Sequence, residues 1–467
     1  MGQIINHFFL PHPPAAIPRV GGKTTEQLTK TIEGLSNAAK TIAEQKPDTI
    51  ILITPHGPCF QDMFYMPSQK RISGDFSAFG CKKLILGFDN DFELAELISH
   101  QAKNHGLNAG FADDATMKRH GIPYDLDHGV TVPLYFIMRE YRDFKVLPIS
   151  LSGLNAKEHY RFGILLREAI RQSDRNVVLI GSGNLSHRLT ETSPCGYSED
   201  GVLFDKAVRK LLLAEDAEGF LSFDPKAAKK AAQCGIESYR VVLGTLDGFR
   251  FLPRILSYEA PLGVGYLCAE ITCGKATESI FTRFLIEEEQ RKALLREKEA
   301  PPIKLARYAI DAFLHGEKNP RVPPNTEKEL SEQRGGVFVS LYSDGELRGC
   351  IGTTKATHPN LAEEIISNAI YAASKDNRFP PLRPKELADI TITVDFLHSP
   401  EEVIDHSELD PEKYGIIAEN RGKVGVVLPS VIGIETVEDQ IRTARERAGI
   451  HPWHRLKLQR FTVTHFE

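Results

Sequence analysis

The chain is poor in cysteine and has no long apolar run, and both shortages narrow the class of protein. Seven cysteines are scattered over 467 residues without a CxxC pair, and their odd number leaves one unpaired. This usage does not fit a disulfide-stapled secreted fold and indicates reduced thiols. No apolar run is long enough to cross a bilayer. The N-terminus, MGQIINHFFLPHPP, lacks the basic segment of a signal peptide, so we expect a cytoplasmic protein.

An excess of positive charge is also lacking. The formal net charge is -5 at pH 7, whereas nucleic acids are bound by basic surfaces, so nothing indicates a nucleic-acid partner. Hydrophobic residues make up 41% and charged residues 25%, the balance of an ordinary globular protein. The length exceeds that at which a single core tends to split, which favours two domains.

One charged segment divides the chain. Residues 286–302, IEEEQRKALLREKEAPP, are rich in charge and end in a proline pair, so they can form a solvated helix but not a core. We therefore predict a first domain over residues 1–280, a charged linker over 281–302 and a second domain over 303–467. The linker could be a rigid helix or a loose tether.

Strand-like and helix-like patterns alternate before the linker. The runs at 49–54, 145–151 and 177–181 are apolar, as in strands that are covered on both faces. Helical patterns cover residues 24–46 and 155–172. This order predicts an α/β sandwich, in which ligands gather beyond the carboxyl ends of the strands.

Hairpins mix with helices after the linker, which predicts a smaller α+β domain. One hairpin turns at Ser343-Asp344-Gly345 and a second around Asn420-Arg421-Gly422. The expected elements are a helix at 303–315, a hairpin at 337–351, a helix at 361–375, a strand at 390–397, the second hairpin, a helix at 436–448 and a strand at 459–466.

Four of the sixteen histidines lie in special local contexts. His12, in LPHPP, His56, in TPHGP, and His187, at the end of GSGNLSH, each follow a strand-like run. His128, in DHGVTVPL, opens a helical stretch. The carboxyl ends of parallel strands share one edge, so these side chains can converge there, on backbone that proline and glycine restrict.

Glu237 is the carboxylate candidate, because it stands after a glycine at the start of a helical pattern. The helix dipole favours its ionised form, which a metal ligand needs. Each of these residues alone is more often a turn or capping group, and only their joint pattern indicates a metal site. His105, His120 and His159 lie in plainly polar contexts and are expected to have no such role.

Five motifs in a fixed order resemble those of the class III, LigB-like extradiol ring-cleavage dioxygenases and of the related Memo family. The resemblance covers roughly residues 1–275. The motifs are PHPP (11–14), TPHGP (54–58), DHGVTVPL (127–134), GSGNLSH (181–187) and CGIES (234–238).

The resemblance implies iron(II) held by His12, His56 and Glu237, with His187 as the acid/base and His128 as a further active-site histidine. Two histidines and one carboxylate leave open positions on iron(II) for a catechol-like small molecule and O2. An imidazole that titrates near neutrality can take up and return the catechol proton. The implied activity is that of an iron(II)-dependent oxidoreductase that opens the ring.

Other interpretations of the same residues stay open. Memo relatives often have cysteine as the third ligand, and Cys234 lies three residues before Glu237; we favour Glu237 because oxygen and imidazole ligands suit iron(II). The same set would also serve a zinc hydrolase, with His187 as the proton shuttle. A third interpretation is a metal-binding or redox module without enzymatic activity.

Residues 303–467 resemble the AMMECR domain family. The motifs that carry the resemblance are LRGCIG (347–352), RGGVFV (334–339) and DNRFP (376–380). Arg348 and Cys350 could build a pocket, or could belong to the core of a hairpin. Proteins of the Memo and AMMECR kinds occur together with a radical SAM protein, so the resemblance implies such a partner.

Overall fold

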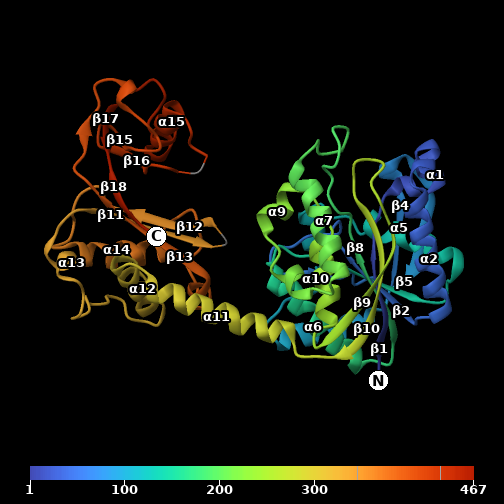
Figure 1. Ribbon diagram of the computed structural model, residues 1–467. Coiled ribbons are helices and arrows are strands. Elements are labelled where there is room, and N and C mark those ends of the chain that lie inside the picture. The colour runs from blue at the N-terminus through green and yellow to red at the C-terminus, as the bar shows by residue number, and fades with distance from the viewer. Residues whose placement is uncertain (344, 432) are drawn as a thin grey trace. The chain divides into compact units, whose positions relative to one another are not determined.

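The computed structural model describes residues 1–343, 345–431 and 433–467, and the chain divides into two compact units, Met1–Glu288 and Glu289–Glu467 (Figure 1). The division falls within helix α11 (Ile280–Lys298), which forms from the segment expected to be a charged linker. None of the α11 side chains is buried, as its charge-rich sequence predicts. Among the described residues, no helix has the length and apolar character that a membrane span requires.

Unit 1 is built on an eight-stranded mixed sheet, in the order β6-β3-β7-β2-β8-β1-β10-β9. Its four central strands are parallel, and they confirm the three strands that the sequence predicted in this unit. The strands are β1 (Gln3–Leu10), β2 (Thr49–Thr54), β3 (Phe64–Tyr65), β6 (Ala109–Gly110), β7 (Lys145–Ser150), β8 (Asn176–Ser182), β9 (Phe249–Glu259) and β10 (Tyr266–Ala276), beside a hairpin of β4 (Arg71–Phe76) and β5 (Cys81–Asp89).

Helices cover both faces of this sheet, because its central strands are apolar on both sides. Along β2, Ile50 and Leu52 join one buried cluster, whereas Ile51 and Ile53 join the other. The predicted α/β sandwich is therefore confirmed. The helices of unit 1 are α1 (Pro18–Gly21), α2 (Thr29–Gln45), α3 (Phe92–Asn104), α4 (Asp114–Arg119), α5 (His128–Glu140), α6 (Ala156–Gln172), α7 (Glu199–Leu213), α8 (Ala217–Leu221), α9 (Pro225–Lys230) and α10 (Ile236–Thr245).

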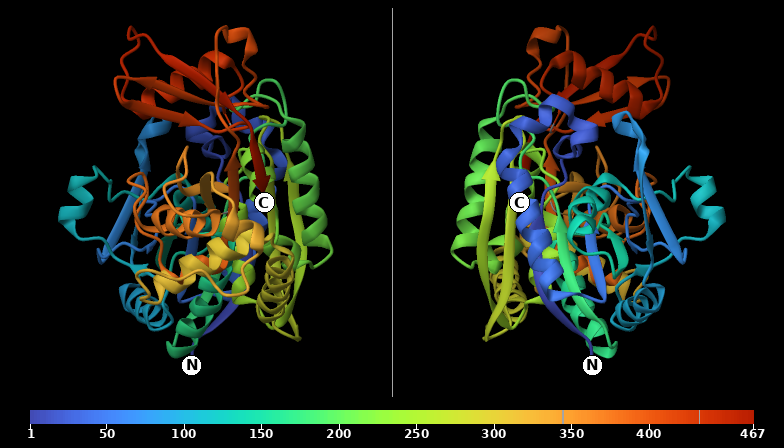
Figure 2. Two further views of the ribbon diagram at one scale, coloured as in Figure 1. Left: turned by 90° about the vertical axis from the view of Figure 1, so that its left-hand side faces the viewer. Right: turned by 90° about the vertical axis from the view of Figure 1, so that its right-hand side faces the viewer.

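Unit 2 holds two four-stranded sheets, in the orders β12-β11-β13-β18 and β14-β17-β15-β16. Figure 2 shows them as two lobes, with the second sheet and α15 in red. The elements are α12 (Pro301–Leu314), α13 (Lys328–Glu332), β11 (Gly336–Ser343), β12 (Glu346–Gly352), α14 (Leu361–Ser374), β13 (Ile390–Leu397), β14 (Glu401–Glu402), β15 (Gly415–Asn420), β16 (Lys423–Val427), α15 (Val437–Ala448), β17 (Lys457–Phe461) and β18 (Val463–Phe466).

Both predicted hairpins of unit 2 are present, as β11 with β12 and β15 with β16. The first was expected to turn at Ser343-Asp344-Gly345, of which Asp344 lies outside the described residues. The single strand predicted at 459–466 is wrong. The chain breaks at Thr462, so that β17 pairs with β15 in one sheet and β18 pairs with β13 in the other.

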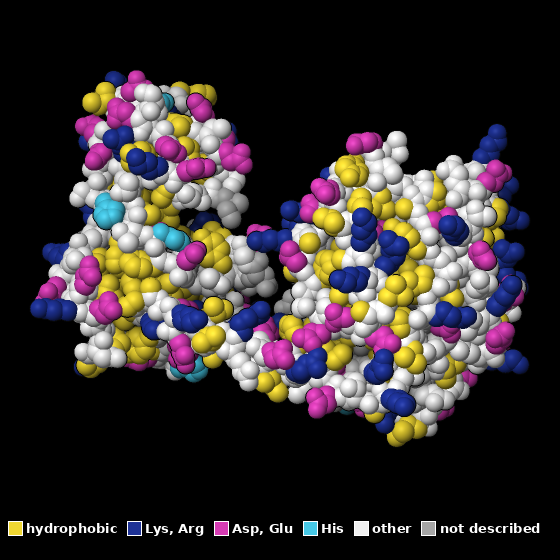
Figure 3. All heavy atoms as spheres, in the orientation of Figure 1, with side chains coloured by type: hydrophobic (Ala, Val, Ile, Leu, Met, Phe, Trp, Pro, Cys, Tyr) yellow, Lys and Arg dark blue, Asp and Glu magenta, His cyan; other side chains and the backbone are white. Residues whose placement is uncertain are grey.

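The surface carries both signs of charge. On the face that Figure 3 shows, lysine and arginine side chains are interspersed with acidic ones on each unit, without an extended patch of one sign. This distribution agrees with the small formal net charge of -5.

Helices α6 and α10 approach each other closely at two glycines, Gly163 and Gly244. A Cβ atom added at Gly163 would lie 2.1 Å from the carbonyl oxygen of Val241, and one at Gly244 would lie 2.0 Å from that of Tyr160. Backbone therefore packs on backbone here, without room for a side chain. The residues that precede α10 reach the candidate site described below.

We predict that Gly163→Ala destabilises unit 1 by about 1–3 kcal/mol, because the added methyl group forces the two helices apart. Denaturant unfolding followed by circular dichroism measures the free energy of unfolding. Gly87→Ala is the matched control, since the nearest atom to its added Cβ lies at 3.9 Å. Equal stabilities of the two variants would contradict the close approach of α6 and α10.

Candidate metal centre

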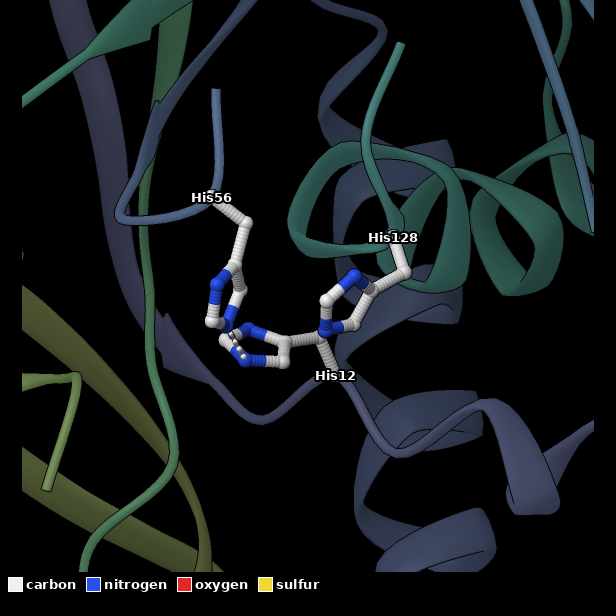
Figure 4. A group of neighbouring side chains, drawn as sticks. All are labelled: His12, His56 and His128. Atoms are coloured by element: carbon white, nitrogen blue, oxygen red, sulfur yellow. Dashed lines mark hydrogen bonds between the residues drawn. The ribbon is translucent and has the colours of Figure 1, made fainter. Parts of the chain in front are cut away.

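Three histidine rings converge at the carboxyl edge of the parallel strands in unit 1. His12 follows β1, His56 follows β2 and His128 is the first residue of α5. Their ring nitrogens lie within 4.8 Å of one another, one per residue, and could hold a metal ion. Figure 4 shows the rings turned toward a common point, with Nε2 of His56 3.0 Å from Nε2 of His12.

A hydroxyl group fixes which nitrogen of His12 faces this point. The hydroxyl of Ser182 donates to the carbonyl oxygen of Gly129 at 2.6 Å, and it lies 2.9 Å from Nδ1 of His12. Its only proton is used, so it must accept from Nδ1–H of His12. The lone pair of the buried ring is therefore on Nε2, which points at His56. The backbone N–H of His12 donates to Oδ1 of Asn184 at 3.1 Å.

Asp127 ties the end of β2 to the start of α5. Its Oδ1 accepts from the hydroxyl of Thr54 and from the backbone N–H of Gly129, both at 2.7 Å. Asp127 thus caps α5 and also binds the last residue of β2, two residues before His56. The link brings His128 close to His56, and the centroids of their rings lie 4.2 Å apart. Burial raises the pKa of Asp127, and the hydrogen bonds from Thr54 and Gly129 oppose that rise.

His187 lies beside the three rings, in the segment after β8. Its backbone N–H donates to the carbonyl oxygen of Ala231 at 3.2 Å. Its ring Nδ1 is buried and has no hydrogen-bond partner among the described residues. A positive charge on His187 lowers the pKa values of His12, His56 and His128. Of the four histidines predicted to converge, the structure groups the rings of His12, His56 and His128.

The structure does not bring Glu237 to the histidines. Its carboxylate accepts from the guanidinium group of Arg240, one turn later on α10, and its Oε2 lies 3.5 Å from Nδ1 of His159. Arg240 is 1% exposed, and a buried guanidinium group needs a carboxylate partner. The predicted ligand set of His12, His56 and Glu237 therefore departs from the observed group, in which His128 is the third member.

Cys234, rather than Glu237, lies beside His12, although the sequence favoured Glu237 as the third ligand. Its Sγ lies 3.6 Å from Nε2 of His12 and accepts from the backbone N–H of Asn184 at 3.3 Å. Burial raises the pKa of this thiol to about 12. His159, which lies in a polar sequence context, is buried, with Nδ1 2.9 Å from the carbonyl oxygen of Asn155. Its environment of Phe64, Glu237 and Arg240 comes from distant segments, so no local signal could have revealed it.

Burial keeps the rings neutral. It lowers the pKa of His12 well below its usual range, and it lowers those of His56 and His128 to about 4, with a smaller contribution from neighbouring imidazoles. Neutral imidazole is the form that binds metal ions, and such ligands suit iron, zinc, copper and nickel. The fixed lone pair on His12 and the convergence of the rings therefore fit a transition metal.

Comparison with protein families agrees with this architecture. A family model described as the catalytic LigB subunit of aromatic ring-opening dioxygenase matches residues 6–268, and the AMMECR1 model matches residues 303–466. The two-part organisation expected from the sequence motifs is thereby confirmed. The first model covers the sheet edge that carries all four histidines.

Similar proteins repeat one or both parts. A Clostridium acetobutylicum protein is 38% identical over 463 residues, which cover 98% of each chain. A Thermotoga maritima protein is 46% identical over 171 residues, which cover 36% of this chain and 98% of that protein. Among solved structures, an uncharacterised Escherichia coli K12 protein matches with 15% identity and a TM-score of 0.41, over 57% of this chain and all of that one.

We predict that the stability of metal-free protein falls as the pH drops from about 6.5 to about 4. The pKa values of His56 and His128 are lowered in the folded chain, so the unfolded chain binds more protons in this interval. Urea unfolding after chelation, repeated across the interval, measures the effect. His56→Gln should give a shallower pH dependence, and an identical slope for the two proteins would contradict the lowered pKa.

Proposed function

Because the chain belongs to the family of the catalytic LigB subunit of aromatic ring-opening dioxygenases over residues 6–268, we propose that unit 1 is a metal-dependent oxidoreductase that opens the ring of a catechol-like small molecule. The observation that carries the proposal is the convergence of three neutral imidazoles, those of His12, His56 and His128, within 4.8 Å. Iron(II) is the proposed metal, and zinc is the alternative.

Different residues of unit 1 are proposed to bind the metal and to transfer the proton. Ring nitrogens of His12, His56 and His128 would hold the metal, and Ser182 keeps the lone pair of His12 in place. Iron(II) held there would supply the redox chemistry of ring opening and polarise the two oxygens of a catechol. The imidazole of His187 would take a proton from a catechol hydroxyl and later return it, because its charge acts on the three neighbouring rings.

An aromatic side chain borders the same group. Phe79 packs edge-on against His128, with ring centroids 5.3 Å apart, and is itself 40% exposed. A partly exposed ring beside His128 offers a planar, apolar wall. This wall supports an aromatic substrate rather than a polar peptide.

A specific observation favours a second candidate, a zinc hydrolase. Among the described residues, the metal-holding group contains three imidazoles and no carboxylate, and the neighbouring group is the Cys234 thiol. Three histidines with an open position are also the ligand set of a hydrolytic zinc site, where zinc would supply Lewis-acid chemistry. Stoichiometric zinc in protein purified without added metal would favour this candidate.

The resemblance of the two parts to the Memo and AMMECR families is the ground for a proposed partner. The Clostridium acetobutylicum relative shares the whole length, so both parts are kept together there as well. We propose a radical SAM protein as the partner. In this alternative the chain is a metal-binding or redox module for that partner and does not itself turn over a substrate. Co-purification under anaerobic conditions tests this, and failure of such a protein to bind the full chain would count against it.

Elemental analysis of anaerobically purified protein tests the ligand set. We predict about one metal ion per chain in the wild type and its loss in His12→Ala and His128→Ala, because each substitution removes one imidazole of the group. Glu237→Gln should keep the metal, since its carboxylate pairs with Arg240. Retention in His128→Ala together with loss in Glu237→Gln would instead support the set of His12, His56 and Glu237.

The role of His187 has a separate test. His187→Ala should keep the metal, because this ring lies outside the group of three, but it should lower turnover of catechols by about 10²–10⁴-fold through the lost proton transfer. Oxygen consumption by the iron-loaded protein measures turnover, and metal analysis of the same sample is the control. Loss of the metal from this variant would show that His187 is a ligand.

A further inference from the structure

The first sheet of unit 2 has two unlike faces. Val337, Val339 and Leu341 of β11 alternate with Phe338, Ser340 and Tyr342, and only the former belong to the buried cluster formed with α12 and α14. The other face carries nucleophilic and titratable groups, which come from all four strands. They are Ser340, Tyr342, Cys350, Thr393, Asp395 and His465.

Strand register places these groups in two rows. Ser340 is opposite Cys350 on one side and Thr393 on the other, while Asp395 is opposite His465. The hydroxyl of Ser340 donates to Sγ of Cys350 at 3.2 Å. Nδ1 of His465 forms a hydrogen bond with Oδ1 of Asp395 at 2.7 Å. Burying polar groups on a sheet face costs free energy. Their concentration on the face opposite α12 and α14 therefore indicates a function other than packing.

The backbone of Cys350 is clamped from one loop. Its N–H donates to Oδ2 of Asp376 at 2.9 Å, and its carbonyl oxygen accepts from the guanidinium group of Arg378 at 3.3 Å. Asp376 in turn accepts from Nε of Arg378 at 2.9 Å. Because β12 is an edge strand, these two backbone groups would otherwise face water. The clamp holds the half-buried thiol at a fixed position.

Positive charge is in excess beside this thiol. Arg378 is paired with Asp376, whereas Arg447, on α15, donates to the carbonyl oxygen of Val426 at 2.8 Å and has no carboxylate partner among the described residues. Burial raises the pKa of the Cys350 thiol, and the hydrogen bond from Ser340 and the charges of Arg378 and Arg447 oppose that rise. Only one of these two guanidinium groups has a carboxylate partner among the described residues, so their combined charge favours an anion beside the thiol.

Apolar surface lies next to the thiol on the same face. A Cβ atom added at Gly352 would lie 2.2 Å from the ring of Phe338, so the glycine allows this half-buried ring to lie across β12. A thiol and an aromatic ring are thus grouped on one face of the sheet, and the charges of Arg378 and Arg447 act on that thiol. A purely structural role would explain the clamp, but not the unpaired charge.

We propose that this face of unit 2 is a second ligand site, separate from the histidine centre, for a small molecule that carries an oxyanion. The carboxylate or phosphate of the ligand is held by Arg447 and Arg378, and its body lies against Phe338 and the thiol of Cys350. The site does not depend on the activity proposed for unit 1.

Alkylation of the full-length protein tests the proposal, with mass spectrometry of the peptide that contains Cys350. Iodoacetate and iodoacetamide both form a thioether as the thiol sulfur displaces iodide and the thiol proton is released, but only iodoacetate carries a carboxylate. We expect the ratio of the iodoacetate rate to the iodoacetamide rate to be about 3–10-fold higher at Cys350 than at exposed Cys59.

Substitutions in α15 test whether Arg447 causes the preference of Cys350 for iodoacetate. Arg447→Gln should lower the ratio at Cys350 to that of Cys59, whereas Arg447→Lys, which keeps the charge, should retain much of it. Arg442→Gln is the matched control, because Arg442 lies on the same helix but pairs with Asp439. A circular dichroism melt of each variant verifies folding.

Competition distinguishes the two oxyanions. Inorganic phosphate that slows alkylation of Cys350 but not of Cys59 would indicate a phosphate ligand, whereas a preference for iodoacetate without competition by phosphate would indicate a carboxylate. The proposal is overturned if Cys350 reacts only after unfolding, if its ratio equals that of Cys59, or if Arg447→Gln leaves the ratio unchanged.

Discussion

The hydroxyl of Ser182 is the group on which the candidate site depends, because it joins three segments of unit 1 at one atom. It donates to the carbonyl oxygen of Gly129 and accepts from His12, so the end of β8, the start of α5 and the segment after β1 are held together. The same bond leaves the lone pair of His12 on Nε2. Burial then keeps the neighbouring rings neutral, and neutral imidazoles can share a cation rather than repel one another.

Much of this arrangement could be predicted from local sequence. Apolar runs that end in PHPP, TPHGP and GSGNLSH identify strands, and parallel strands must share a carboxyl edge, so His12, His56 and His187 had to meet. Glu237 could not be placed in this way. A helical pattern gives the start of α10 to within a residue or two but not the direction of each side chain, and Arg240, one turn further on, takes the carboxylate. Cys234, just before the helix, then faces His12.

Each unit has a half-buried cysteine beside charged or candidate metal-binding groups, but the surroundings of the two thiols differ. Cys234 lies among neutral imidazoles, whereas Cys350 lies beside guanidinium groups and accepts from Ser340. The hairpin that carries Cys350 could be predicted from its turn and its alternation. The clamp by Asp376 and the approach of Arg447 could not, since both depend on segments that are 26 or more residues away along the chain. The break between β17 and β18 was missed for the same reason, because only pairing with two different sheets reveals it.

The central claim concerns the ligand set, and X-ray absorption spectroscopy of the metal-loaded protein tests it most directly. Imidazole ligands give a multiple-scattering pattern that carboxylates lack, so the spectrum reports the number of rings on the metal. The account predicts three imidazoles, from His12, His56 and His128, in the wild type and an unchanged spectrum in Glu237→Gln. A wild-type spectrum of two imidazoles with a carboxylate, altered in Glu237→Gln, would contradict it.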